Sequence, residues 1–521
     1  KMKTLKLISF AFLASVLSSS CSDNLNLSPR YGLNADAVYS DPGNYINVLA
    51  KLYAGLAISG NQGPAGMPDI GGIDEGFSQY VRVLWNLQEL PTDEEVCGWN
   101  DPGIPELNSM TWNDNSSFVS AMYYRIYYQI TLANEFLRYT ELQWMDDHSF
   151  SDQEKTMITD MAAEARFLRA LSYYHAMDLF GNVPFVDETD NPGLFFPEQI
   201  MRKDLFNWLI TELNSIEPLL KPALTVDYGR ADRGALLALR SKLYLNSEVY
   251  TGQSNYEDCM TDCASLISLG YSLEPNYAYN FNADNHLSPE FIFAINFDGN
   301  HTRTYGGTTF LLHSHLGGSM DIPSFGTTSG WQGNRATKAW FDKFLDTLDS
   351  RRMVHLDGQE DTITTIGTFT EGIAITKWNN TNRDGSVGSE PVTFVDIDFP
   401  MFRLADIYLM YAECAARTGQ NMSAGVGYFN LIRERAYGNS SMNISSLNLQ
   451  EILDERAREL YGEGHRRSDL IRYGQFTGGD YLWPFKGDEQ FGASTSSHYD
   501  LYPIPSADVL SNQNLVQNPG Y

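Results

Sequence analysis

The sequence predicts a mostly α-helical protein in which paired helices form a scaffold and long, partly β loops form a second face. Apolar residues recur at three- and four-residue spacing over 117–143, as they do along one side of a helix. Residues 55–115 and 270–400 are instead rich in Gly, Asn, Asp and Thr, with short β-like runs such as Glu290–Ile295. Because long loops on a rigid scaffold usually carry function, we expect these two segments to form the ligand-binding face.

Capping residues, Gly and Pro mark where the helices begin and end. Ser151 followed by Glu154 is a capping box, and the helix that it begins runs to Phe180 before Gly181. Helix pairs of this kind resemble tetratricopeptide units, although long insertions separate them here. We therefore expect one domain over 21–521, with its scaffold at approximately 117–270 and 400–475. Further helical patterns cover 201–220, 232–250, 255–269, 403–418, 423–437 and 449–462.

Residues 1–20 have the pattern of a secretory signal peptide. Lysines precede an apolar run over Leu7–Leu17, which is too short to remain in a bilayer as a helix. Small residues then lead to Cys21, as in bacterial lipoproteins, where such a cysteine is lipidated and becomes the first residue. We expect lipidation of Cys21. The alternative is an ordinary signal peptidase site beside an unrelated cysteine.

The charge balance excludes one class of partner. Asp and Glu number 65 against 36 Lys and Arg, a formal net charge of −29. Proteins that bind nucleic acids neutralise phosphates with Lys and Arg, so this chain is not expected to bind them.

Aromatic residues make up 13% of the chain, enough to supply exposed rings for a ligand as well as a core. No second run of 18 apolar residues follows the first twenty residues, so we expect membrane attachment through lipid only.

The search for catalytic motifs is mostly negative. The chain has no nucleophile elbow, zinc-protease motif, phosphate-binding loop or dinucleotide fingerprint. Asp93-Glu94-Glu95 is the acidic cluster to test for glycosidase carboxylates, although a solvated turn is the favoured interpretation. His313 and His315 would present two imidazoles on one side of a strand, as some metal sites do.

Three aromatic residues in Gly-rich loops give a stronger signal. Trp99, Tyr305 and Trp331 are each flanked by Gly and small polar residues, which cannot bury a large ring locally. Flat rings stack on the C–H face of a sugar, and such contacts contribute roughly 0.5–1.5 kcal/mol each beyond burial. The alternative is that the rings plug the junction between loops and helices. Composition leaves both interpretations open.

Several motifs resemble those of SusD/RagB-family lipoproteins and follow the family's order from Cys21 to the last residue. The resemblance implies a cell-surface glycan-binding lipoprotein of the outer membrane, without catalysis or a required cofactor. Its partner would be a SusC-like TonB-dependent transporter. A branch related to RagB handles peptides instead, and a secreted glycoside hydrolase is the less favoured alternative. The motifs are Glu164–Tyr174, Leu179–Pro184, Phe402–Glu413, Glu455–Arg472, Tyr502–Pro505 and Asn518–Tyr521.

Within this family, the loop motifs are most similar to those of starch-binding members. Arg82, the run Glu89–Glu94 and the aromatic loops follow the order and spacing of their binding region. One departure is Cys97, which stands where those members have a second Trp. The resemblance favours an α-glucan such as starch or maltooligosaccharides. The implied site residues are Trp99, Tyr305 and Trp331 as an aromatic arc, Arg82 bonding sugar hydroxyls, and Asp101 as a polar contact.

A structural calcium ion is a further implication of the same resemblance. Asp284, Asp396 and Asp398 match positions near a calcium ion in the starch binders. Hard oxygen ligands from distant segments suit Ca²⁺. The same residues also fit ordinary loop acids.

Overall fold

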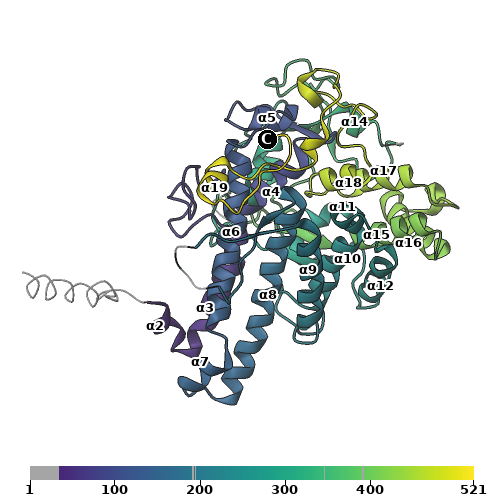
Figure 1. Cartoon of the computed structure of the whole chain (residues 1–521). Helices are drawn as coiled ribbons and strands as arrows, with labels where there is room; N and C mark the ends of the chain where they lie inside the picture. Colours follow the sequence, from purple (N-terminus) through teal and green to yellow (C-terminus); the bar gives the residue numbers. More distant parts are fainter. Residues whose placement is uncertain (1–33, 191–192, 194, 345, 390–391) are drawn as a thin grey trace, which may run out of the picture.

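The computed structural model describes residues 34–190, 193, 195–344, 346–389 and 392–521. The predicted signal peptide and Cys21 lie outside the described residues. Helices dominate the described chain, and its strands form four two-stranded antiparallel pairs. The predicted fold class, a helical scaffold with a loop-rich and partly β face, is confirmed (Figure 1).

The scaffold is a row of helices in which each packs on its neighbour. The contacts run from α6 to α8, α8 to α9, α10 to α12, α12 to α15 and α15 to α16. Figure 1 shows α9, α10, α12, α15 and α16 side by side, so α12 and α15 meet although the whole 270–400 segment separates them in sequence. These helices are α6 (Ser117–Arg138), α8 (Asp152–Phe180), α9 (Arg202–Ile216), α10 (Arg233–Leu245), α12 (Tyr256–Ile267), α15 (Leu404–Thr418) and α16 (Met422–Tyr437).

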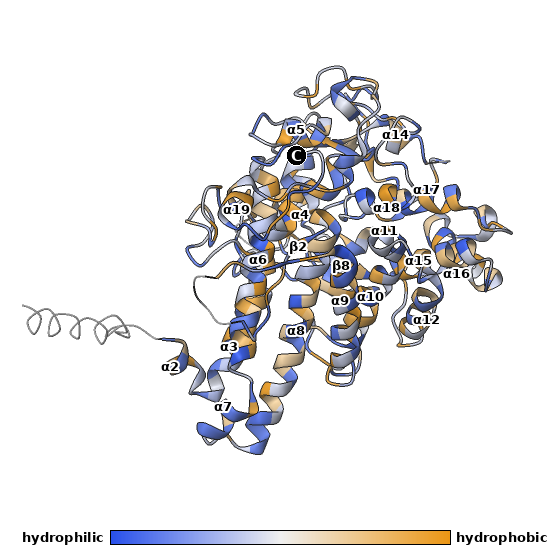
Figure 2. Cartoon of the chain, in the orientation of Figure 1, coloured by the Kyte–Doolittle hydropathy of each residue, from blue (hydrophilic) through white to orange (hydrophobic). Residues whose placement is uncertain are grey.

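The longest helix, α8, begins and ends as predicted. Ser151 Oγ accepts the Glu154 N–H at 3.4 Å, and Glu154 Oε2 accepts the Ser151 N–H at 2.7 Å. Gly181, with φ 74°, terminates the helix in a conformation that favours glycine. The first turns of α8 are exposed and hydrophilic beside α7 (Leu142–Asp147), whereas its second half lies in the core (Figure 2).

The 55–115 segment contains a helix that the sequence does not predict. Helix α4 (Tyr80–Glu89) has all ten of its residues buried, including Arg82 and Glu89. A helix surrounded by protein has no solvent-facing side, so its apolar residues do not show the usual spacing. Other helices include α2 (Ala35–Tyr39), α3 (Tyr45–Ala57), α5 (Ile104–Ser109), α11 (Ser247–Thr251), α14 (Lys338–Phe341), α17 (Leu449–Glu459), α18 (Arg466–Arg472) and α19 (Ser506–Ser511).

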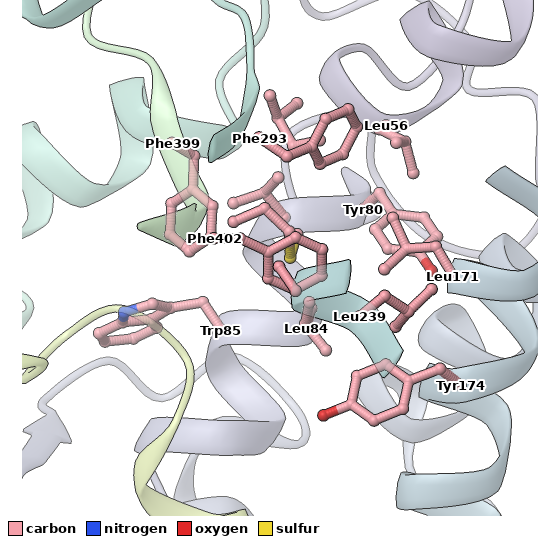
Figure 3. Close-up of a cluster of buried hydrophobic side chains, with 14 of the residues drawn as sticks. Leu56, Tyr80, Leu84, Trp85, Leu171, Tyr174, Leu239, Phe293, Phe399 and Phe402 are labelled. Atoms are coloured by element: carbon pink, nitrogen blue, oxygen red, sulfur yellow. The ribbon is translucent and has the colours of Figure 1, made fainter. Parts of the chain in front are cut away.

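The core forms where α4 meets the scaffold and a central strand pair. The predicted strand is confirmed as β4 (Phe291–Ile295), which pairs with β8 (Phe399–Arg403). Rings from both strands pack against side chains of α3, α4, α8 and α10 (Figure 3). The cluster includes Leu56, Tyr80, Leu84, Trp85, Leu171, Tyr174, Leu239, Phe293, Phe399 and Phe402.

The acidic run after α4 is buried, which corrects the expectation of a solvated turn. Asp93, Glu94 and Glu95 are each at most 2% exposed. Asp93 forms an ion pair with Arg466 at 2.6 Å, and Glu95 lies 2.6 Å from His315 Nε2. These partners are distant in sequence, so the local pattern of charges gives no sign of them. These three acids are therefore buried in the structure and do not line an open site.

Candidate functional site

A short strand pair brings two of the predicted rings together. Strand β1 (Glu95–Cys97) runs antiparallel to β5 (Asn334–Ala336), and the ladder continues as the Gly98 N–H donates to Gly333 O at 2.9 Å. Trp99, which follows β1, and Trp331, which precedes β5, therefore lie at the same end of the ladder. The indole N–H of Trp99 donates to the Trp331 carbonyl at 3.2 Å.

Helix α13 (Gly307–His315) joins the Tyr305 loop to the Trp331 loop. Tyr305 stands just before its first turn, and at its end the Trp331 N–H donates to the His313 carbonyl at 2.7 Å. The expected strand with two imidazoles on one side is therefore wrong. Every residue of α13 is buried, so its sequence shows no helical spacing. The two imidazoles also have different partners: His315 bonds to Glu95 and to Leu311 O, and His313 bonds to neither.

Side chains just before α4 hold the Tyr305 loop in place. The Thr304 hydroxyl donates to Glu75 Oε1 at 2.6 Å, and the Gly307 N–H donates to Gln79 Oε1 at 2.8 Å. Gly76 fits against this loop because it lacks a side chain: a Cβ there would lie 2.7 Å from Tyr305 Cβ. The loop that carries Tyr305 is thus fixed by both main-chain and side-chain contacts.

The three predicted rings are neighbours in a continuous arc. The ring centroids of Trp99 and Trp331 are 6.4 Å apart with planes tilted by 46°, and those of Tyr305 and Trp331 are 6.3 Å apart with a tilt of 47°. Trp331 lies between the other two. All three rings are half-buried, so each packs on protein and keeps part of its surface open to solvent.

Arg82 lies beneath this arc, among the rings, and its side chain does not reach the open surface. The residue is 2% exposed, with its guanidinium carbon 4.2 Å from the Phe310 centroid and 5.7 Å from that of Trp99. Its Nη1 donates to Tyr305 O at 3.4 Å, while Nε and Nη2 have no partner among the described residues. Burial lowers the pKa of Arg82 to about 10, and nearby acidic groups, including Cys97 and Asp101, offset part of this effect.

Asp101 is half-buried at the edge of the arc, at the end of the Trp99 loop. Its carbonyl accepts the Ile104 N–H at 3.0 Å, which links the loop to α5. Its carboxylate opposes the lowering of the Arg82 pKa by burial, so Asp101 acts electrostatically on the guanidinium beneath the arc. The structure thus places all five predicted binding residues in one region.

Two of the three predicted calcium ligands share an acidic cavity of about 380 Å³. Asp396 and Asp398 line it together with Asp298, Asn296 and Asn382. Burial raises the pKa of Asp398 to about 7, with Asp396 and Asp298 adding to the rise. Oxygen donors that repel one another in this way suit a hard cation. Among the described residues, no three acidic, His or Cys side chains are already spaced as a complete metal site, so amide or main-chain oxygens would have to complete the shell.

The third predicted ligand, Asp284, points its carboxylate elsewhere. That carboxylate accepts the Arg383 N–H at 3.1 Å and lies 3.9 Å from the Arg383 guanidinium. The neighbouring Asn285 reaches the cavity wall instead, because its side chain bonds both the N–H and the carbonyl of Asp398, at 3.0 and 2.8 Å.

Some residues of the arc were missed from the sequence. Phe394 packs against Tyr305 with ring centroids 5.2 Å apart, and Phe310 covers Arg82. Phe394 stands between Thr and Val in a β-like run, and Phe310 lies in a helix with no polar face. The Gly-flanked pattern that identified the other rings is absent at both positions.

No described helix combines the length and hydropathy that crossing a bilayer requires.

Comparison with known proteins identifies the family. The family profile described as the SusD family matches residues 355–521. The chain is 36% identical to the starch-binding protein SusD of Bacteroides thetaiotaomicron over 575 residues, covering 100% of both chains. It is 24% identical to SusD-like protein P25 of Formosa agariphila, covering 91% of this chain and 90% of that one. A solved structure, surface glycan-binding protein A from Bacteroides thetaiotaomicron in complex with laminarihexaose, has a TM-score of 0.68 at 19% identity and covers 91% of this chain and 99% of that one. The resemblance drawn from the sequence motifs is thereby confirmed, and the chain belongs to the SusD family.

Proposed function

We propose that this protein binds glycans at the cell surface and delivers them to a SusC-like TonB-dependent transporter of the outer membrane. The observation that carries the proposal is the arc of Trp99, Tyr305 and Trp331, whose partly exposed rings are neighbours. Aromatic faces of this kind stack on sugar rings. The names of the relatives, a starch binder and a glycan binder solved with laminarihexaose, support a saccharide ligand.

The tilt of the rings favours a curved glucan. Neighbouring planes differ by 46° and 47°, so a flat ligand cannot lie face-on against all three. An α-1,4-linked glucan bends at every linkage, whereas a β-1,4-linked glucan is extended. Identity to starch-binding SusD over the full chain points the same way. Starch or maltooligosaccharides are therefore the proposed ligands.

Calorimetry against three oligosaccharides tests the ligand. We expect maltoheptaose to bind in the millimolar to micromolar range, which is typical of a few stacking contacts. Laminarihexaose should bind more weakly and cellohexaose should give no heat. Preference for cellohexaose would contradict the curved-ligand argument. Absence of binding to any glycan, together with binding to peptides, would replace the proposal with a RagB-type peptide receptor.

We expect binding without turnover. The acidic run that the sequence offers as the cluster to test for glycosidase carboxylates is buried, and Asp93 and Glu95 are paired with Arg466 and His315. Prolonged incubation of the pure protein with starch, levan and dextran checks this expectation. A steady release of reducing ends would favour a glycoside hydrolase instead.

Anchoring and transport complete the proposal. A lipid on Cys21 would hold the protein at the outer membrane, and the transporter would move the ligand. Cys21→Ala should therefore leave the outer-membrane fraction in a strain that lacks the transporter, because no lipid remains to hold the variant. Unchanged fractionation would contradict lipidation.

Co-purification from gently solubilised outer membranes tests the partner, and recovery of the protein alone would count against a stable complex.

A structural calcium ion in the acidic cavity is a separate part of the proposal. Asp396 and Asp398 would hold it, with amide or main-chain oxygens completing the shell. The ion would offset the burial and the repulsion from Asp396 and Asp298, which together raise the pKa of Asp398. Its role would be to fix the loops that meet there, since Asp396 also accepts N–H groups of Gly299 and Ser389 at 2.8 and 2.6 Å.

A further inference from the structure

His313 packs against Trp331, the central ring of the aromatic arc, without lying on the open surface of the arc. The residue is 0% exposed and belongs to α13, the helix between the two aromatic loops. Its imidazole is stacked on the Trp331 indole, with centroids 4.7 Å apart and planes only 15° from parallel. One face of Trp331 is therefore covered by His313, and the opposite face is left for other contacts.

The two ring nitrogens tie down two different loops. Nδ1 lies 2.7 Å from Ser329 O in the Trp331 loop, and Nε2 lies 3.0 Å from Thr393 O beside Phe394. Phe394 in turn packs on Tyr305. A carbonyl oxygen can only accept a hydrogen bond, so a neutral imidazole can donate to one of the two at a time. The Ser329 hydroxyl, 3.3 Å from Nδ1, can donate to that nitrogen when Nε2–H bonds Thr393.

We propose that His313 is a positioning residue for glycan binding: it sets the orientation of Trp331 by stacking on it, and it limits the movement of the Trp331 loop relative to the Phe394 segment by donating to Ser329 O or Thr393 O. The proposal rests on the proposed function and deepens it. His313 does not touch the ligand. It holds the Trp331 ring at its tilt relative to Trp99 and Tyr305, with the face that His313 does not cover turned away from His313.

A double-mutant cycle on maltoheptaose affinity tests this role. In the wild-type background, His313→Ala should weaken binding at least about fivefold, because the indole loses its backing. In the Trp331→Ala background, the same substitution should change affinity less than about twofold, since no indole remains to be positioned. An equal loss in both backgrounds, or no loss in the wild type, would overturn the proposal.

A conservative variant and a matched control sharpen the cycle. His313→Phe keeps a flat ring under Trp331 and should bind more tightly than His313→Ala; binding no better than Ala would overturn the stacking role. If His313→Ala does not fold, His313→Gln replaces it in the cycle, because the amide removes the ring while still donating to one carbonyl. The control is His148→Ala, which removes the imidazole 4.0 Å from Trp144 on α7 and should leave affinity unchanged.

A measurement without ligand separates this proposal from the proposed function. His313→Ala should change the near-ultraviolet circular dichroism of the protein in the wild-type background and not in the Trp331→Phe background. If wild-type protein binds none of the three oligosaccharides, the proposed function fails, and the spectra still decide whether His313 orients Trp331. Identical spectral changes in both backgrounds would overturn the proposal.

Discussion

Replacing Trp331 by Ala should weaken glycan binding with little loss of stability. Only the ring is removed, because the Trp331 N–H still donates to His313 O and its carbonyl still accepts the Trp99 indole N–H. A fully buried Trp→Ala change costs ~3–5 kcal/mol. Since Trp331 is only partly buried, we expect ~1–2 kcal/mol in the free energy of unfolding, or a few degrees at most in Tm.

The loss in affinity follows from the contacts that a sugar would make on the free face. One stacking contact of 0.5–1.5 kcal/mol, together with burial of the exposed part of the ring, gives ~1–2 kcal/mol. That corresponds to a roughly 5- to 30-fold higher Kd for maltoheptaose. Calorimetry gives the Kd and differential scanning calorimetry gives the Tm on the same samples.

Two other tryptophans provide matched controls. Trp144→Ala removes a half-buried indole that also lies against a histidine, but on α7, at the opposite end of the molecule from α5 (Figure 1). Its affinity should be unchanged. Trp85→Ala removes a fully buried ring whose N–H donates to Gly462 O at 2.9 Å, and its Tm should fall much further. If Trp331→Ala melts as early as Trp85→Ala and binds normally, the ring is a structural plug and the ligand binds elsewhere.

Three further predictions follow from the buried charges. Arg82→Met should weaken glycan binding about tenfold without lowering Tm, because the guanidinium supports the rings while Met still fills the space; unchanged affinity would contradict that role. A chelator should lower Tm and added Ca²⁺ should restore it, whereas Asp396→Asn should not respond to either; a chelator without effect would argue against the ion. The pKa of Glu459 is lowered to about 2, mainly by Arg435 and Arg403 against the effect of burial, so its contribution to stability is present above its ordinary value near 4.5 and is lost as pH falls towards 2. The urea midpoint should therefore fall between pH 5 and pH 3, and a constant midpoint would refute this.

The scaffold could be predicted because its helices are bounded by visible signals. Ser151 and Glu154 mark the beginning of α8 and Gly181 marks its end, and the exposed residues of helices such as α8 and α9 make their apolar spacing recognisable. Helices α4 and α13 lack that contrast, since all of their residues are buried. Burial on every side removes the polar half of the pattern, so the sequence predicts a loop at α4 and a strand at α13. They are also the helices that support the arc.

Membership of the arc could be predicted from the sequence, whereas its geometry could not. The β1–β5 pair has three residues in each strand and joins Cys97 to Asn334, so neither strand is long enough to give a periodic signal. The sequence indicates His313 only as a candidate metal ligand, because its stacking partner, Trp331, comes from a different segment of the chain. The resemblance implies that Arg82 bonds sugar hydroxyls, but it does not indicate that Arg82 packs against Phe77 and Phe310, which come from separate segments.

The glycines that flank the rings have a physical role in packing that their sequence pattern does not show. A Cβ on Gly333 would lie 2.5 Å from the Trp99 ring, and a Cβ on Gly330 would lie 2.3 Å from Leu316 O. These glycines therefore allow the rings and their loops to pack closely on main chain. The same packing fixes each ring while leaving part of it exposed, so support and ligand contact are properties of one arrangement. The two interpretations that composition left open, structural plug and stacking surface, are in this fold compatible.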